Sequence, residues 1–272
     1  RALLLCLAMR SEPVLVERYR ELAQARAYLH GPPEVLGLDG LLAAADRVWG
    51  AGWGRASLAD LSAVRAELAG RTVACLGEAI GPEAGLLAMT TPPTLPGRPL
   101  PLGLDVAAAL GSQLAERSLP PEVGAGARAY AVSRKPDGLR ASWESTVAAM
   151  LQRPEGLPAA YRSEVYERKQ LNCCLAAWAG LVARAPEVVA RGPKRYRPWR
   201  PELVEPVPAF YRAYADMCAE LATRLEAWGV SGEALTDLRL LEREVRGLAP
   251  CAEDQLAGRK VSEETDAGGF LE

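Results

Sequence analysis

Four carboxylates in the central part of the chain could serve acid–base chemistry: Asp105, Glu144, Glu164 and Glu167. Glycoside hydrolysis typically uses two carboxyl groups, one as the acid and one as the base or nucleophile. The opposing interpretation is structural. Glu164 and Glu167 would then be solvated helix charges, and Asp105 would cap the helix that begins beside it. We favour the structural interpretation and keep Asp105, Glu164 and Glu167 as candidates for a glycan- or peptide-hydrolase-like activity.

A basic segment with two aromatic residues follows in the last third of the chain. Guanidinium groups bind carboxylates and phosphates, and aromatic rings can stack on bases. A plain solvated loop is the simplest interpretation. Among binding roles, docking on an acidic protein surface is favoured over RNA binding. The residues that would bind are Arg191, Lys194, Arg195, Tyr196, Arg197, Trp199 and Arg200.

Three polar residues share a predicted helix, with Arg168 and Asn172 four positions apart and Gln170 between them. A polar side chain in an apolar helix usually needs a buried hydrogen-bond partner. The pattern therefore predicts a structural polar network, with a ligand-facing role as the alternative.

His30 is the only histidine, so a Ser-His-Asp triad or a typical zinc site would depend on it. It stands at a predicted helix end, where an imidazole interacts favourably with the helix dipole. The 6 cysteines show no C-x-x-C spacing and are interpreted as mostly reduced and structural. No phosphate-binding glycine motif occurs. The sequence predicts no metal site and no cofactor.

Composition favours helices. Among 272 residues, Ala, Leu, Arg and Glu dominate and Phe occurs only 2 times. A net charge of −2 gives no overall field that would attract nucleic acid or an anionic membrane. No apolar run is long enough to predict a membrane span.

Helical spacing and proline breaks predict an all-α protein of about ten helices, packed as an antiparallel bundle or an incomplete α/α toroid. The chain begins inside a helix that ends near Arg10, so we expect a truncated start. Pro208 is expected to open a helix whose apolar stripe is Phe210, Tyr214, Met217, Leu221, Leu225 and Trp228. The other predicted helices cover residues 13–30, 38–48, 58–68, 103–117, 123–133, 139–151, 163–191 with a break near 186, and 235–248.

A proline-rich segment at residues 91–102 cannot be helical, because proline removes backbone donors and restricts φ. It predicts a connector between an N-terminal helical part, residues 1–90, and a C-terminal helical part, residues 103–272.

Three segments, occurring in the expected order, carry a family resemblance. Residues 99–112 resemble the stretch "RPLPSGLDVMAALGS", residues 158–178 resemble "PAFMRTEAWQDKQLNTALGSW", and residues 204–211 resemble "YVEPNPEFY". Together these segments make the chain similar to the prokaryotic family filed as domain of unknown function 3160. The resemblance covers roughly residues 99–230 and implies a helical fold but no reaction.

The chain departs from that family after Trp178. The family continues with "AELRHD", whereas this chain has Gly180 in place of Glu and Val182 and Ala183 in place of Arg and His. If that polar cluster forms a site in relatives, this chain lacks it. Relatives are longer at both ends, so the chain resembles the helical middle of the family architecture.

These observations favour a non-catalytic helical subunit or interaction module of a larger assembly, with other protein subunits as partners. The hydrolase-like domain is the alternative. Nothing in the sequence indicates a compartment.

Overall fold

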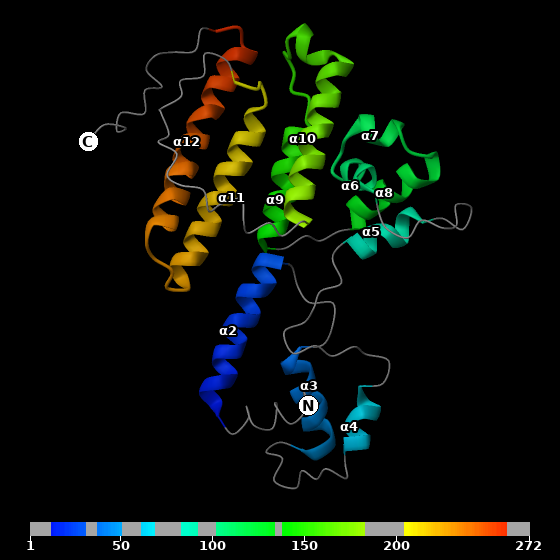
Figure 1. Ribbon diagram of the computed structural model, residues 1–272, viewed down its shortest axis with the longest axis vertical. Helices are drawn as coiled ribbons and strands as arrows, with labels where there is room; N and C mark the ends of the chain where they lie inside the picture. The colour runs from blue at the N-terminus through cyan, green and yellow to red at the C-terminus, as the bar shows by residue number, and fades with distance from the viewer. Residues whose placement is uncertain are drawn as a thin grey trace. The chain divides into compact units, whose positions relative to one another are not determined.

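A computed structural model describes residues 12–30, 37–50, 61–68, 83–91, 102–133, 138–182 and 204–259. Within these ranges every regular element is helical, with eleven α-helices, so the predicted all-α class is confirmed (Figure 1). None of the described helices is both long and apolar enough to cross a bilayer.

The chain divides into two compact units. The first unit comprises residues 1–82 and 136–140, and the second comprises residues 83–135 and 141–272. The predicted connector at 91–102 stays a prediction, because residues 92–101 lie outside the described ranges.

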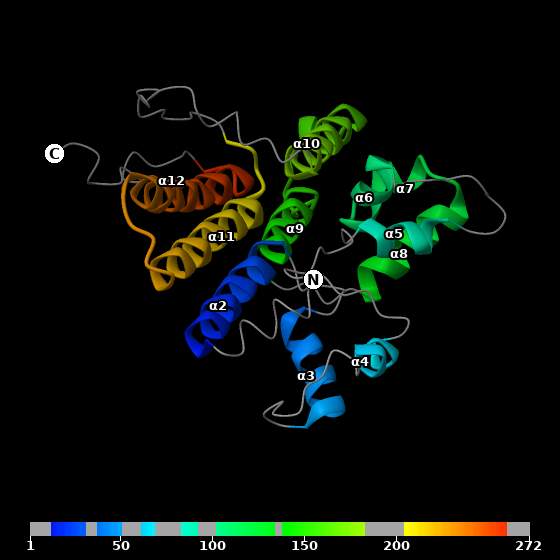
Figure 2. The same ribbon diagram turned by 60° about the horizontal axis from the view of Figure 1, so that its bottom comes forward.

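The first unit contains helices α2 (Pro13–His30), α3 (Leu38–Trp49) and α4 (Leu61–Glu67), which Figure 2 shows. Its core joins Tyr19 of α2 to Leu38, Leu41 and Ala45 of α3. The Leu38 N–H donates to the Tyr19 hydroxyl at 3.1 Å. This bond satisfies a free donor at the start of α3, because Gly37 has no side chain with which to cap it.

The second unit begins with α5 (Glu83–Thr90), α6 (Gly103–Ala109), α7 (Gln113–Arg117) and α8 (Pro121–Ser133). The single helix expected over 103–117 is wrong, because α6 and α7 are separate. Gly111 adopts a φ of 103°, and the Ser112 N–H donates a hydrogen bond to the Ala107 carbonyl oxygen at 2.8 Å. Ser112 then caps α7 by accepting from the Ala115 N–H at 3.2 Å. Apolar spacing continues across this break, which explains why periodicity alone missed it.

Helices α9 (Gly138–Met150) and α10 (Glu164–Val182) follow, with the 3₁₀ helix η2 (Ala159–Arg162) before α10. We call the hydrophobic core shared by α5 to α10 the main cluster. Its most buried members are small or medium side chains, which allows these short helices to pack closely. They include Leu86, Val106, Ala107, Ala115, Ala127, Val147, Leu171 and Cys174.

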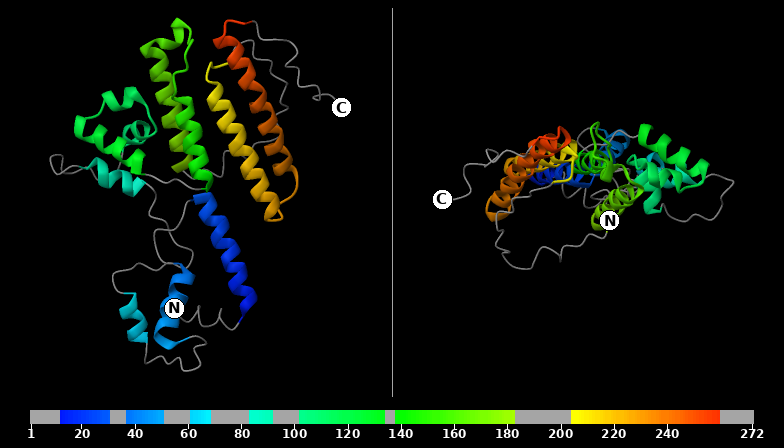
Figure 3. Two further views of the ribbon diagram at one scale, coloured as in Figure 1. Left: turned by 180° about the vertical axis from the view of Figure 1, so that it is seen from behind. Right: turned by 90° about the horizontal axis from the view of Figure 1, so that it is seen from above.

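The last two helices, α11 (Pro208–Ala227) and α12 (Glu233–Leu256), form an antiparallel hairpin (Figure 3). Proline at the first position of α11 confirms the predicted start. The predicted apolar stripe of α11 is not the buried face of the helix. The most buried residues of α11 are Tyr211, Ala215, Cys218 and Ala222. Close helix packing favours small side chains at the centre of the contact, so the larger predicted residues flank it. Together with Val204, Val245, Ala249, Cys251 and Ala252, Tyr211 and Ala215 form a second core, the hairpin cluster.

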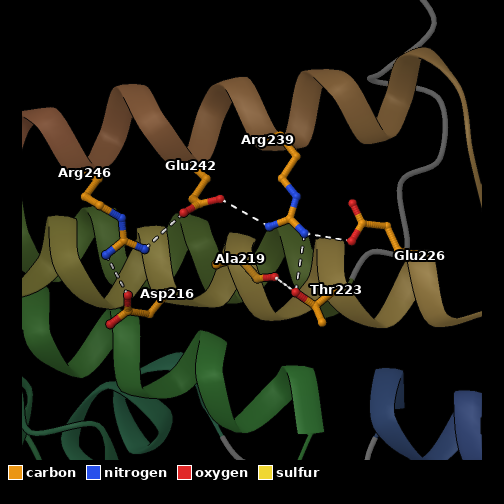
Figure 4. A network of polar contacts seen from close by, with 7 residues as sticks. All are labelled: Asp216, Ala219, Thr223, Glu226, Arg239, Glu242 and Arg246. Carbon is orange, nitrogen blue, oxygen red and sulfur yellow. Dashed lines mark hydrogen bonds and ion pairs between the residues drawn. The ribbon is translucent and has the colours of Figure 1, made fainter. Parts of the chain in front are cut away.

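A ladder of charged side chains runs along the outside of this hairpin (Figure 4). Arg246 of α12 donates to Asp216 of α11 at 2.9 Å, and Arg239 donates to Glu226 at 2.9 Å. Glu242 lies between the two arginines and accepts from both, at 3.2 and 3.4 Å. The acceptors raise the pKa of both guanidinium groups. Such exposed ion pairs each stabilise a fold only weakly.

Candidate functional site

The three segments that resemble the family meet on helix α10. A Cβ added to Gly103 of α6 would lie 2.8 Å from the side chain of Leu175 and 3.4 Å from the ring of Trp178. At the other end of α10, Tyr166 and Lys169 contact Glu205. Figures 1 and 3 show α9 and α10 between the short helices α5 to α8 and the α11–α12 hairpin. Helix α10 is therefore the element that organises the second unit.

Asp105, one of the three candidate catalytic residues, is fully buried in the first turn of α6. Its Oδ2 atom accepts from the Leu102 N–H at 3.0 Å. This is the capping contact that the sequence indicates. A carboxylate in this position also interacts favourably with the helix dipole.

The other candidate carboxylates also have separate contacts. Glu167 is 11 % exposed and forms ion pairs with Arg117 at 2.7 Å and with Arg153. Glu164 is exposed and pairs with Arg168 one turn later, at 2.7 Å. Glu144 is buried on α9.

None of these carboxylates lines the cleft of about 480 Å³ in the described part of the first unit. Its lining residues are Val16, Arg20, Asp39, Leu42, Ala43 and Asp46.

The predicted polar trio separates onto two faces of α10. Gln170 is buried, and its Nε2 donates to the carbonyl of Met150 at 2.7 Å, which satisfies an acceptor at the end of α9. Arg168 and Asn172 are exposed on the opposite side. Residues four apart share a helix face and the residue midway does not, so the structure does not bring the three together.

Two further predictions fall outside the described residues. The basic segment from Arg191 to Arg200 is one of them, and the side chain of His30 is the other. Within the described ranges, no group of three or more His, Cys, Asp or Glu side chains could hold a metal ion.

A cluster of tyrosines around Glu205 is the feature that the sequence did not reveal. The Tyr166 hydroxyl donates to Glu205 Oε2 at 2.8 Å, and Lys169 pairs with Oε1. The ring of Tyr161 stands edge-on to that of Tyr166, with centroids 4.9 Å apart. Tyr166 and Glu205 are 39 residues apart, so no local pattern announces their contact.

Burial sets the protonation of this cluster. Burial and then the hydrogen bond to Glu205 raise the pKa of the Tyr166 hydroxyl. Burial also raises the pKa of Tyr211, to about 12. Both phenols are therefore protonated at neutral pH, which allows Tyr166 to donate to the carboxylate.

The opposite side of α10 is exposed along the helix. Val165 near its start is 77 % exposed. Toward the end of the helix the exposed side chains become small, and an alanine Cβ at Gly180 would meet nothing within 4 Å. We call this surface the outer face of α10; it consists of Glu164, Val165, Arg168, Lys169, Asn172, Cys173, Ala176, Ala179 and Gly180.

Two adjacent cysteines on α10 should differ sharply in reactivity. Cys173 is exposed, whereas Cys174 is buried, and burial raises the pKa of its thiol to about 12. Because the thiolate is the reactive form, we expect iodoacetamide at pH 8 to label Cys173 at least about tenfold faster than Cys174. Peptide mapping with tandem mass spectrometry would resolve the two. In urea the two cysteines should be labelled equally. Equal labelling of the native chain would contradict the burial of Cys174.

The described helices of the second unit form an all-α scaffold in which α10 contacts α6, α7 and α9. A family model described as "Protein of unknown function (DUF3160)" matches residues 83–267. The chain belongs to this family, as the three resembling segments indicate. Comparison with the curated proteins found no match. Comparison with the solved structures also found none.

Proposed function

We propose that this chain is a non-catalytic helical subunit that binds another protein through the outer face of α10. The observation that carries the proposal is the contrast between the two sides of that helix. The inner side of α10 contacts α6 and α9, and residues near its start contact Glu205. The outer face is exposed from Glu164 to Gly180.

The composition of the outer face suits a helix of a partner protein. Small residues occupy its second half, namely Cys173, Ala176, Ala179 and Gly180. The distance between packed helices depends on the side chains at their contact, so a partner helix could approach this part of α10 closely. Glu164 and Arg168 lie at the other end and provide charges at the rim of such a contact. The basic segment at 191–200 stays a separate predicted binding element, because it lies outside the described residues.

The positions of the candidate carboxylates support an interaction role over hydrolysis. Asp105 caps α6, and Glu167 is held by two arginines. A catalytic pair needs two carboxyl groups that face one reacting bond. Among the described residues, no observation favours such a pair.

The test is gentle native purification of the full-length protein followed by mass spectrometry of bound subunits. Ala176→Arg places a long charged side chain on the outer face, and we expect bound partner to fall at least about tenfold, since an unpaired charge is costly at an interface core. Ala129→Arg makes the same change at an exposed position of α8 and should leave binding unchanged.

Replacing Arg195, Arg197 and Trp199 together by alanine tests the predicted basic binding segment. A lone monomer, or full binding by Ala176→Arg, would contradict the proposal. Hydrolysis screens with Glu164 and Glu167 variants would then be the next step.

A further inference from the structure

The outer face of α10 has an uncharged polar residue at its midpoint. The face runs from Glu164 to Gly180, so Asn172 lies midway between its ends. The Asn172 side chain is exposed and makes no hydrogen bond among the described residues. A carboxamide group both donates and accepts hydrogen bonds, so it is complementary to a second carboxamide. In paired helices, a single asparagine at the contact can specify the register of the pair.

The two halves of the outer face differ in size and in charge. The half before Asn172 carries all of its charged side chains, and Val165 in that half is 77 % exposed. The half after Asn172 is uncharged, and its exposed residues are small. Facing helices pack most evenly when large side chains of one lie against small side chains of the other. A pair of helices that places unlike halves together would therefore fill the contact.

An antiparallel contact between two copies of α10 places the unlike halves together. With a two-fold axis beside Asn172, Val165 of each copy lies opposite Ala179 of the other, and Arg168 lies opposite Ala176. At roughly 1.5 Å per residue, the two Arg168 residues are then about 12 Å apart along the helix axes. A parallel pair in register would instead place them directly opposite each other. Charge and size therefore both favour the antiparallel arrangement.

We propose that the protein bound by the outer face of α10 is a second copy of this chain, in an antiparallel dimer whose two-fold axis passes beside Asn172. This inference rests on the proposed function, because it names the partner of the same surface. The two Asn172 amides pair across the axis, and each Arg168 keeps its ion pair with Glu164 at the rim. A contact along one helix is small, so we expect the dimer to dissociate on dilution.

Sedimentation velocity of the full-length protein over a dilution series tests the dimer. Because Asn172 meets its own copy, Asn172→Asp and Asn172→Lys each place two like charges together at the axis. Each variant alone should need at least about tenfold higher concentration to dimerise, since like charges across an interface repel. An equimolar mixture of the two variants places opposite charges together and should restore the dimer. Circular dichroism would verify that both variants fold, as we expect for an exposed position.

Ala129→Asp and Ala129→Lys make the same changes at an exposed position of α8 and should leave self-association unaltered. A parent chain that stays monomeric throughout the dilution series would overturn the inference. So would a mixture of the Asn172 variants that is no more dimeric than either variant alone. If the monomeric chain captures a different protein that Ala176→Arg releases, the second copy is wrong and the proposed function stands. A monomeric chain that captures nothing would overturn both.

Discussion

Replacing Gly126 with alanine is expected to lower the free energy of unfolding by about 2 kcal/mol or more, because the new methyl group would collide with backbone. A Cβ at this position of α8 would lie 1.9 Å from the carbonyl oxygen of Met89 on α5. Neither atom belongs to a flexible side chain, so the two helices themselves would have to move apart. Urea unfolding followed by circular dichroism would measure the change.

Gly124→Ala provides a matched control on the same helix. Its added Cβ would meet Glu116 at 3.4 Å, which is ordinary van der Waals contact. Because alanine favours the helix over glycine by roughly 1 kcal/mol, this variant should be neutral or more stable. Equal losses in the two variants would mean that the close approach of α5 and α8 is not what makes Gly126 necessary.

Asp105→Ala should produce the second large loss, about 2 kcal/mol, because it removes a buried cap and leaves the Leu102 N–H without this acceptor. The carboxylate is completely buried and lies in the first turn of α6, whose other face packs against Leu175 and Trp178. Thermal or urea unfolding of the purified chain would measure the effect.

Glu164→Ala tests whether the loss is specific to Asp105. Glu164 is exposed and pairs only along the surface of α10 among its described contacts, so its replacement should change stability by less than about 0.5 kcal/mol. If Asp105→Ala were as stable as the parent chain, the carboxylate would not be needed as a cap. A role in chemistry would then merit a direct assay.

The prediction for Asp105 bears on how function is assigned in this chain. A buried aspartate near a family motif invites a catalytic interpretation, but its geometry is that of a helix cap. Glu167 also has structural contacts, because it forms ion pairs with one arginine of α7 and one arginine of the turn after α9. Among the described residues, the outer face of α10 is the surface that we propose for function.

Local signals in the sequence predict the helical class and most helix positions. Proline at residue 208 predicts the start of α11, and the apolar spacing from Leu235 to Leu248 predicts most of α12. These signals succeed because helix periodicity, caps and proline act over a few residues. The three resembling segments likewise indicate the family, because that resemblance depends only on residue identity and order along the chain.

The buried face of each helix, and the pairs of distant residues that meet, depend on how the helices pack against one another. The core face of α11 lies one residue away from the stripe of large side chains, because α12 packs closely against alanine and cysteine. The contact between Tyr166 and Glu205 joins residues 39 positions apart, and Gly126 is required by a carbonyl on another helix. Such contacts depend on how helices pack in three dimensions, and local spacing carries no information about that packing.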